Sequence, residues 1–358
     1  MLAVLAALLV ALAGCGAPER PSFHGAAAAS SAPSASPSPS GPAEFTLVVA
    51  GDVHFTGRTA GLLRDPATAF GPVASVLKSG DLTLLNLETA ITERGSPQPK
   101  TYHFRAPVAA FEAVRAAGVD AVSLANNHTL DYGQVGLTDT LAAAKAAQYP
   151  VFGAGANATE AYAPWYTTVN GVSVAVLGFN QVHELTAAWA ARDDRPGIAM
   201  AFDTGRALGA VRAARARADV VVVFNHWGTE GVSCPNGEQK SFAAALIAAG
   251  ADVVLGAHAH TLQGSGWQGP AFVAYGMGNF LWYGDSRSTE TGVLRLRVRG
   301  RSVVSSEFLP AVVSGTGQPA LLSGAAADRL SQRYAGLRRC AGLSGAATAS
   351  PGASASTR

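Results

Sequence analysis

Metal-ligating residue types follow two short apolar runs of the sequence. Asp52 and His54 come just after one run, and a carboxylate and an imidazole two residues apart can chelate one divalent cation. His258 and His260 follow another run, Val253–Leu255, and neutral imidazole is the commonest metal ligand in proteins. If these runs are buried strands, the polar residues emerge at the carboxyl ends, where ligands of open α/β sheets bind. The alternative is that the two histidines share a loop by chance.

Three more apolar runs end in polar residues of the same kind. Leu82–Leu87 is followed by Glu88, another run by Asn127 and His128, and a third by His226. Each residue alone has a structural explanation as a cap, turn or loop residue. Five such strand ends would instead converge at one edge of a sheet. The set therefore predicts a site for divalent ions, and its imidazole and carboxylate ligands favour manganese, iron or zinc over calcium.

The elements that must position these residues alternate along the chain. Strands are expected at 45–50, 82–87, 121–124, 151–152, 166–169, 172–177, 220–224, 253–255, 272–275 and 293–298, and helices at 73–78, 108–117, 137–147, 204–216, 238–249 and 325–336. Asn170-Gly171 predicts a tight hairpin between two of the strands. The alternation favours an α/β fold, with antiparallel pairs where hairpins intervene.

Composition limits the classes of partner. Apolar residues make up 48% of the 358 residues and charged residues 14%, which allows a large core. The net charge of +2 is too small to favour nucleic acid or an anionic membrane surface as a partner. Arg212, Arg215 and Arg217 have the spacing of an exposed helix face, and the arginines at 295–301 alternate as on the outward face of a strand. No nucleic-acid partner is expected.

The N-terminus predicts export from the cytoplasm. Residues 2–13 form an apolar run that is too short to span a bilayer but has the length of a signal-peptide core. Leu12-Ala13-Gly14-Cys15 resembles the bacterial lipobox, so residues 1–15 are expected to be a signal peptide with a lipid-modified Cys15. No Lys or Arg precedes the run, and the alternative is an ordinary cleaved signal and a secreted protein. Residues 16–43, rich in Ala, Ser and Pro, are expected to be a disordered linker.

Two cysteines remain once Cys15 is assigned. Cys234 and Cys340 would both lie outside the cytoplasm, where two leftover thiols suggest one disulfide. Cys234 lies eight residues after His226, so the bridge would also fix a loop near the proposed metal site.

The order of the motifs is similar to that of the metallophosphoesterase (calcineurin-like) superfamily. Asp-x-His, an acidic residue, Asn-His, His and Gly-x-His-x-His follow one another. Over roughly residues 45–310, the residues within and beside these motifs resemble those of the CapA family, which is named for poly-γ-glutamate capsule biosynthesis. The matching motifs are Gly51-Asp52-Val53, Asn86-Leu87-Glu88-Thr89, Ala125-Asn126-Asn127-His128, Asp131-Tyr132-Gly133, His226-Trp227-Gly228-Thr229-Glu230, Gly256-Ala257-His258-Ala259-His260 and Tyr275-Gly276-Met277-Gly278-Asn279-Phe280.

The resemblance implies a four-layer αββα sandwich with mixed β-sheets and a site for two divalent ions. By position, one ion would take Asp52, His54 and His260, the other would take Asn127, His226 and His258, and Glu88 would bridge them where the superfamily usually has Asp. Two ions about 3.5–4 Å apart need a shared anionic ligand, and together they acidify a bound water and hold the oxygens of an in-line displacement.

Four further residues are assigned near this site. His128, which is not a ligand in this assignment, would protonate the leaving group, and Asp131 would orient it; the alternative for Asp131 is an ordinary turn residue. Arg105 would contact a carboxylate-rich polymer or a phosphate, with an exposed strand or loop residue as the alternative. Trp227 would be a wall of the site.

The resemblance implies a domain over residues 44–312. The C-terminal segment that follows, 313–358, is rich in Gly, Ala and Ser and is expected to be disordered from about residue 341. The expected protein is a cell-envelope enzyme that makes, attaches or processes poly-γ-glutamate or a related anionic polymer through a hydrolase-type site. One alternative is an extracytoplasmic phosphoesterase acting on a small or polymeric phosphoester. Another is a non-catalytic scaffold in an envelope polymer synthase complex.

Overall fold

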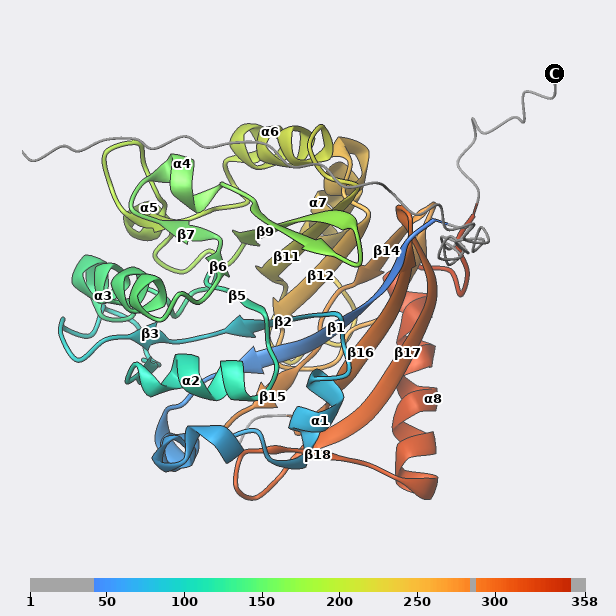
Figure 1. Cartoon of the computed structure of the whole chain (residues 1–358), viewed down its shortest axis with the longest axis horizontal. Coiled ribbons are helices and arrows are strands. Elements are labelled where there is room, and N and C mark those ends of the chain that lie inside the picture. The colour runs from blue at the N-terminus through green and yellow to red at the C-terminus, as the bar shows by residue number, and fades with distance from the viewer. Residues whose placement is uncertain (1–41, 284–287, 349–358) are drawn as a thin grey trace, which may run out of the picture. The chain divides into compact units, whose positions relative to one another are not determined.

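The computed structural model describes residues 42–283 and 288–348, which fold around two β-sheets (Figure 1). The predicted signal peptide, Cys15 and all of the linker before residue 42 lie outside the described residues, as do the last ten residues of the chain. In the described ranges, no helix is both long enough and apolar enough to cross a bilayer.

Within the described part of the chain, the larger sheet has eight strands in the order β18-β17-β16-β1-β2-β5-β6, with β15 also paired to β1. Its strands are β1 (Glu44–Val53), β2 (Leu82–Leu87), β5 (Ala121–Ser123), β6 (Val151–Phe152), β15 (Asn279–Leu281), β16 (Glu290–Arg299), β17 (Ser302–Val313) and β18 (Pro319–Leu321). Strands β1, β2, β5 and β6 run parallel to one another, whereas β16, β17 and β18 are antiparallel to their neighbours.

The smaller sheet has six strands among the same residues, in the order β13-β14-β12-β11-β9-β8. Its strands are β8 (Trp165–Val169), β9 (Val172–Asn180), β11 (Val220–Trp227), β12 (Val253–His258), β13 (Ser265–Gln268) and β14 (Ala271–Ala274). The predicted hairpin at Asn170-Gly171 joins β8 to β9. Two short pairs stand apart: β3 (Ala90–Ile91) with β4 (Arg105–Ala106), and β7 (Ala154–Gly155) with β10 (Gly197–Ile198).

Helices cover the outer face of each sheet. The helices of the described residues are α1 (Ala74–Leu77), α2 (Ala109–Ala116), α3 (Gly133–Ala146), α4 (Ala158–Ala161), α5 (Thr186–Trp189), α6 (Thr204–Arg215), α7 (Gly237–Ala249) and α8 (Gly324–Ala341), with short 3₁₀ helices at Gly57–Arg64, Pro66–Thr68 and Gly71–Val73. Figure 1 shows α2 and α3 beside the larger sheet and α6 and α7 beside the smaller one.

The alternation of side chains along the central strands creates the layers. In β1, Leu47 and Val49 lie in the core between the two sheets, whereas Val48 and Ala50 pack with residues of α1, α2 and α3. In β11, Val222 faces the core between the sheets, and the valines on either side of it pack with α6 and α7. Strands that are buried on both faces need such continuous apolar runs. The predicted four-layer αββα sandwich with mixed sheets is therefore confirmed.

The C-terminal region is more ordered than the sequence indicated. β17 pairs with β16 along its length, although many of its residues are exposed and polar. Helix α8 covers part of this strand, and Tyr334 stacks on Phe308 at 3.9 Å between ring centroids. The prediction of disorder after residue 341 was wrong for residues 342–348, because Ser344 exchanges two backbone hydrogen bonds with Trp267 of β13.

Candidate metal centre

The predicted ligands lie together where strands of both sheets end. Asp52 lies in β1, Glu88 follows β2, His226 lies in β11 and His258 closes β12. Asp52 and Glu88 are 0% exposed and His226 is 1% exposed. The backbone N–H of His258 donates a hydrogen bond of 3.1 Å to Asp52 Oδ2, which joins the two sheets at this edge.

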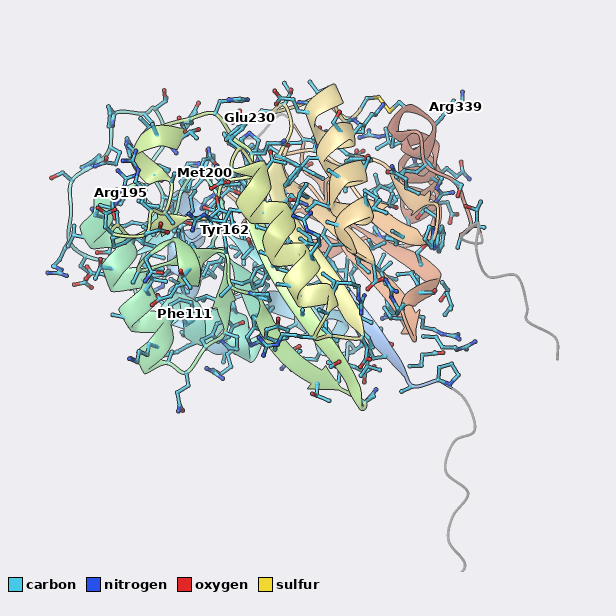
Figure 2. All side chains as sticks on the ribbon, turned by 90° about the horizontal axis from the view of Figure 1, so that it is seen from above. Phe111, Tyr162, Arg195, Met200, Glu230 and Arg339 are labelled. Carbon is cyan, nitrogen blue, oxygen red and sulfur yellow. A yellow bond between two sulfur atoms is a disulfide. The ribbon has the colours of Figure 1, made fainter. Side chains whose placement is uncertain are left out.

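Among the described residues, three groups of side chains place their ligand atoms within 4.8 Å of one another. The groups are Asp52, Glu88 and His260; Glu88, His226 and His258; and Glu230, His258 and His260. Glu88 belongs to the first two groups, which is the position that a carboxylate bridging two ions requires. Glu230 had not been assigned as a ligand, and it is exposed on the loop after β11 (labelled in Figure 2).

Asn127 lies beside the second group. Its Oδ1 is 2.8 Å from His226 Nε2, and its Nδ2 donates to Glu184 Oε2 at 3.1 Å. Lys100 Nζ lies 2.8 Å from the same Glu184 oxygen and donates to the backbone carbonyl of Asn127. These contacts hold the amide with its oxygen toward His226. Lys100 and Glu184 gave no signal in the sequence, because both lie in loops beyond the strand ends that were considered.

Asn86 organises the ligands from inside β2. Its Nδ2 lies 2.9 Å from Asp52 Oδ1, 3.3 Å from Glu88 Oε2 and 3.3 Å from His226 Nδ1. Its Oδ1 accepts a hydrogen bond of 3.0 Å from Asn126. Burying an amide costs free energy unless it is hydrogen-bonded. An asparagine near the end of a mostly apolar strand is therefore a sequence signal for this role.

His128 and Asp131 form a hydrogen-bonded pair beside the ligands. His128 Nδ1 is 2.6 Å from Asp131 Oδ2, and His128 Nε2 is 3.7 Å from Glu88 Oε1. The backbone N–H of Phe104 donates to Asp131 Oδ2 at 2.6 Å, and Lys100 Nζ lies 3.0 Å from Oδ1. Burial raises the pKa of Asp131 to about 6, and the charge of Lys100 opposes this rise. Asp131 is thus placed to orient His128.

The turn after β12 directs two histidines through a backbone conformation that is rare outside glycine. His258 and His260 have φ angles of 83° and 51°, in the left-handed region. Such strain persists only where the surrounding structure holds it. Here the N–H of His258 is bonded to Asp52, and His260 Nδ1 lies 2.8 Å from Asn279 Oδ1. One strand end therefore delivers one imidazole to each of the two groups that share Glu88.

Burial also sets the charge of the ligands. Desolvation lowers the pKa of His226 and His258 well below the usual value, so both rings are neutral, as metal ligation requires. Desolvation raises the pKa of Asp52 and Glu88, and a nearby cation would favour their charged forms. Glu88 Oε1 and His258 Nδ1 are buried without a hydrogen-bond partner among the described residues. These donor atoms fit divalent cations.

His54 is not brought into any of the three groups. Its ring stacks on Phe104 with 4.3 Å between ring centroids, and its Nδ1 accepts a hydrogen bond of 3.0 Å from the backbone N–H of Thr56. The sequence spacing from Asp52 had suggested that the two side chains share one ion. The imidazole lies in an aromatic cluster, and its Nε2 is buried without a hydrogen-bond partner among the described residues, so its assignment as a ligand of that ion stays a prediction.

Arg105 and Trp227, predicted to contact the substrate and to form a wall of the site, both make contacts within the protein. The Arg105 guanidinium lies 3.5 Å from the centroid of the Tyr132 ring. Trp227 is fully buried, and its indole N–H donates to the Tyr275 carbonyl at 2.8 Å. Successive side chains of a strand face opposite sides, so a His226 that faces the ligands turns Trp227 into the core under α7. Trp227 is therefore a core residue and not a wall of the site.

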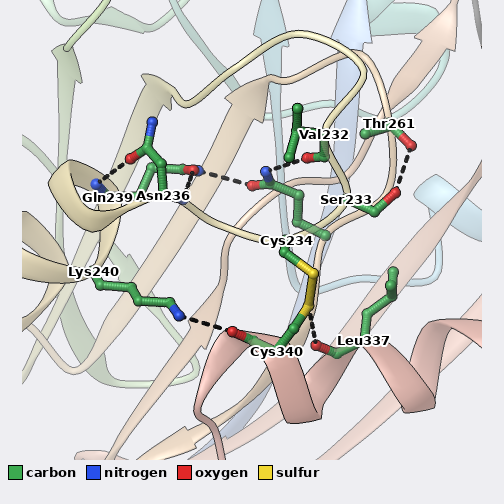
Figure 3. The surroundings of a disulfide bond; sticks show 10 residues. Val232, Ser233, Cys234, Asn236, Gln239, Lys240, Thr261, Leu337 and Cys340 are labelled. Carbon is green, nitrogen blue, oxygen red and sulfur yellow. Dashed lines mark hydrogen bonds between the residues drawn. A yellow bond between two sulfur atoms is a disulfide. The ribbon is translucent and has the colours of Figure 1, made fainter.

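The predicted disulfide is present between Cys234 and Cys340. It joins the loop after β11 to the end of α8, and Lys240 strengthens the same junction by donating to the Cys340 carbonyl at 2.8 Å (Figure 3). The loop that the disulfide fixes also carries Glu230.

Comparison with known proteins decides the family. A family described as "Bacterial capsule synthesis protein PGA_cap" matches residues 46–283. The chain belongs to this family. Relatives of the chain include the capsule biosynthesis protein CapA of Bacillus anthracis, 30% identical over 278 residues, and the PGA biosynthesis protein CapA of Bacillus subtilis, 29% identical over 245 residues. The matches cover 75% and 67% of the chain and 67% and 64% of the respective relatives.

Solved structures with a similar fold include a putative 5'-nucleotidase from Staphylococcus aureus and a phosphatase from Mycoplasma pneumoniae. The first is 21% identical with a TM-score of 0.49, and the match covers 81% of the present chain and 58% of the nucleotidase chain. The second is 13% identical with a TM-score of 0.49, and the match covers 76% of the present chain and 94% of the phosphatase chain. Likenesses at this level do not support the transfer of an activity.

Proposed function

We propose that this protein makes, attaches or processes poly-γ-glutamate or a related anionic envelope polymer through a hydrolase-type site for two divalent ions. The observation that carries the proposal is the position of Glu88, whose carboxylate belongs to two ligand groups at once. One ion would be held by Asp52, Glu88 and His260, and the other by Glu88, Asn127, His226 and His258.

The two ions, when bound, would acidify a water and stabilise charge on the reacting oxygens. The chain itself would orient the reaction through His128 and Asp131. Because His128 Nδ1 is hydrogen-bonded to Asp131 Oδ2, His128 Nε2 is directed toward Glu88. With Nδ1–H donating to Asp131, His128 would have to take up a second proton at Nε2 before it could protonate a leaving oxygen, and the Asp131 carboxylate would stabilise the resulting imidazolium.

The names of the relatives support an anionic polymer as substrate. The Bacillus proteins are named for capsule and PGA biosynthesis, and a protein of Mycobacterium tuberculosis, 34% identical over 203 residues, is named a probable polyglutamine synthesis accessory protein. A phosphoesterase is the second candidate, because a carboxylate shared by two ligand groups beside a His–Asp pair is also the arrangement that an in-line displacement at phosphorus uses.

Metal counting tests the proposal. We expect about two manganese, iron or zinc ions per wild-type chain by elemental analysis, and about one after His258→Ala or His226→Ala, because each histidine is a ligand of one ion. His128→Ala should keep both ions but lose turnover. Two ions retained in His258→Ala would contradict the ligand assignment.

The substrate is tested with the same preparations. Cleavage or transfer of poly-γ-glutamate that fails in His128→Ala would support the polymer. Turnover of p-nitrophenyl phosphoesters alone would favour the phosphoesterase. Bound ions without turnover of either substrate would indicate a scaffold of an envelope synthase complex.

We also propose that the protein is anchored outside the cytoplasm by a lipid on Cys15. A disulfide between Cys234 and Cys340 suits an oxidising compartment and supports this location. In bacteria fed labelled palmitate, the wild-type protein should carry the label and sediment with membranes, and Cys15→Ser should lose both properties. Cys234→Ser is the matched cysteine control and should keep the label. An unlabelled wild-type protein in the medium would instead indicate a cleaved signal.

A further inference from the structure

The segment that leads into β4 turns alternate side chains toward and away from the metal centre. Phe104 stacks on the His128 ring with 3.9 Å between ring centroids. Successive side chains of an extended segment point to opposite sides, and Arg105 accordingly lies against another ring, with its guanidinium 3.5 Å from the centroid of Tyr132. Tyr132 in turn follows Asp131, which is hydrogen-bonded to the same His128. The guanidinium therefore flanks the metal centre.

The position of Arg105 is fixed by its backbone and by the Tyr132 ring. The Arg105 N–H donates to Thr56 Oγ1 at 3.1 Å, and its carbonyl accepts from the same hydroxyl at 3.3 Å. Arg105 is also paired with Ala90 where β4 lies beside β3. A guanidinium over an aromatic face is attracted to the ring and is already ordered. Less side-chain freedom is then lost when the guanidinium binds a ligand.

The partly buried guanidinium of Arg105 has no anionic partner in the described part of the chain. Its Nε is buried without a hydrogen bond, and no ion pair or hydrogen bond joins its terminal nitrogens to residues 42–283 or 288–348. Other partly buried arginines are satisfied, because Arg215 pairs with Asp252 and Arg195 donates to two backbone carbonyls. Buried polar groups are generally hydrogen-bonded. An anion from outside the chain would supply the partner that Arg105 lacks.

The shape of the guanidinium favours a carboxylate as that anion. Its planar fork of N–H groups can donate two parallel hydrogen bonds to the two oxygens of one carboxylate. A γ-linked glutamate chain keeps one free α-carboxylate on every residue, because its peptide bonds use the γ-carboxyl group. Such a chain, lying across the ligand groups, would present further carboxylates on either side of the reacting bond. Phosphate is the other oxyanion that the fork fits.

We propose that Arg105, stacked on Tyr132, binds a free carboxylate of the anionic polymer beside the metal centre. This inference rests on the proposed function, because it takes the polymer as the substrate. It adds to that function a specificity-determining residue, which selects a carboxylate-bearing chain over a neutral one. The metal ligands alone provide no such selection.

Calorimetric titration with a γ-linked glutamate hexamer tests the inference by binding alone. The parent protein is the full chain with His128→Ala, saturated with manganese, so that the hexamer is not consumed. We expect Arg105→Gln in this parent to weaken binding at least about tenfold, because charge-assisted hydrogen bonds are lost. Arg105→Lys keeps the charge but not the fork, and it should recover only part of the affinity.

Arg115→Gln is the matched control. The Arg115 guanidinium also lies over a tyrosine, 5.1 Å from the centroid of the Tyr149 ring, but it donates to the Ala147 carbonyl at 2.6 Å. This variant should bind the hexamer as the parent does. A hexamer whose α-carboxylates are amidated should bind more weakly than the acid, and with the same affinity in Arg105→Gln as in the parent. Inorganic phosphate should likewise bind both proteins equally.

The outcomes separate this inference from the proposed function. Unchanged hexamer affinity in Arg105→Gln, an equal loss in Arg115→Gln, or a loss seen only with inorganic phosphate would overturn the inference alone. A parent chain that binds manganese but not the hexamer would overturn the polymer as substrate, and this inference with it. Hexamer binding through Arg105 in a chain that holds no metal would overturn only the metal centre. Circular dichroism checks that each variant is folded, and Arg105→Lys carries the test if Arg105→Gln is not.

Discussion

Glu88→Gln is expected to reduce the metal content from about two ions per chain to one or none. The neutral amide cannot bridge two cations as the carboxylate can. Turnover of whichever substrate the wild type accepts should fall at least about 100-fold, which corresponds to about 2.7 kcal/mol of transition-state stabilisation. Elemental analysis and kinetics with saturating manganese measure the two effects. Glu88→Asp, which restores the residue usual in the superfamily, should recover part of both.

Stability provides the control for this variant. Glu88→Gln should lose metal ions, but it should not lose stability in the metal-free protein. Burial raises the pKa of Glu88, so its ionised form is disfavoured in the folded, metal-free protein. A raised folded-state pKa gives stability below the unfolded value, and that stability is lost as the pH rises through the folded value. At pH 8, without metal, Glu88→Gln should therefore be at least as stable to urea as the wild type. A clear loss of stability would mean that misfolding, and not lost bridging, had removed the ions.

Removing the disulfide is expected to have the largest effect on stability. Cys234 and Cys340 are 106 residues apart, and cross-linking a loop of about 100 residues corresponds to about 4.7 kcal/mol in the chain-entropy account. The double variant Cys234→Ser/Cys340→Ser should lose free energy of unfolding of that order, with a fall in Tm on the order of 10 °C. Urea unfolding of both proteins measures it.

Reductant supplies the matched comparison for the disulfide. Wild-type protein in dithiothreitol should unfold at the same urea concentration as the double variant, and the double variant should not respond to dithiothreitol. Equal stability of the oxidised and reduced wild type would show that the bridge constrains the unfolded chain less than its length indicates.

The strand ends were predictable from the sequence because the physics there is local. A buried strand needs an apolar run. A carboxylate or imidazole buried directly after such a run costs free energy unless it has a hydrogen-bond partner or binds a metal ion. Asp52, Glu88, His226 and His258 were found in this way, and they lie together as parallel strands require. The resemblance to a known family then supplied the order of the layers.

Other features depended on the three-dimensional arrangement. Lys100 and Glu184 meet Asn127 only because two loops fold over the same strand end. His54 has the spacing of a ligand, but the ring packing of Phe104 and Trp282 decides where it points. β17 was overlooked because a strand covered by one helix does not need a continuous apolar run.

The two ligand groups that share Glu88 each draw side chains from both sheets, Asp52 and Glu88 from one and the histidines from the other. Ions held there would act as fasteners across the sandwich, and by mass action they would stabilise the fold by about 2.7 kcal/mol at 100 times the Kd. This gain does not need His128 or any turnover. A descendant that had lost its chemistry would still be selected to keep its ligands, so in this architecture metal binding can outlive catalysis.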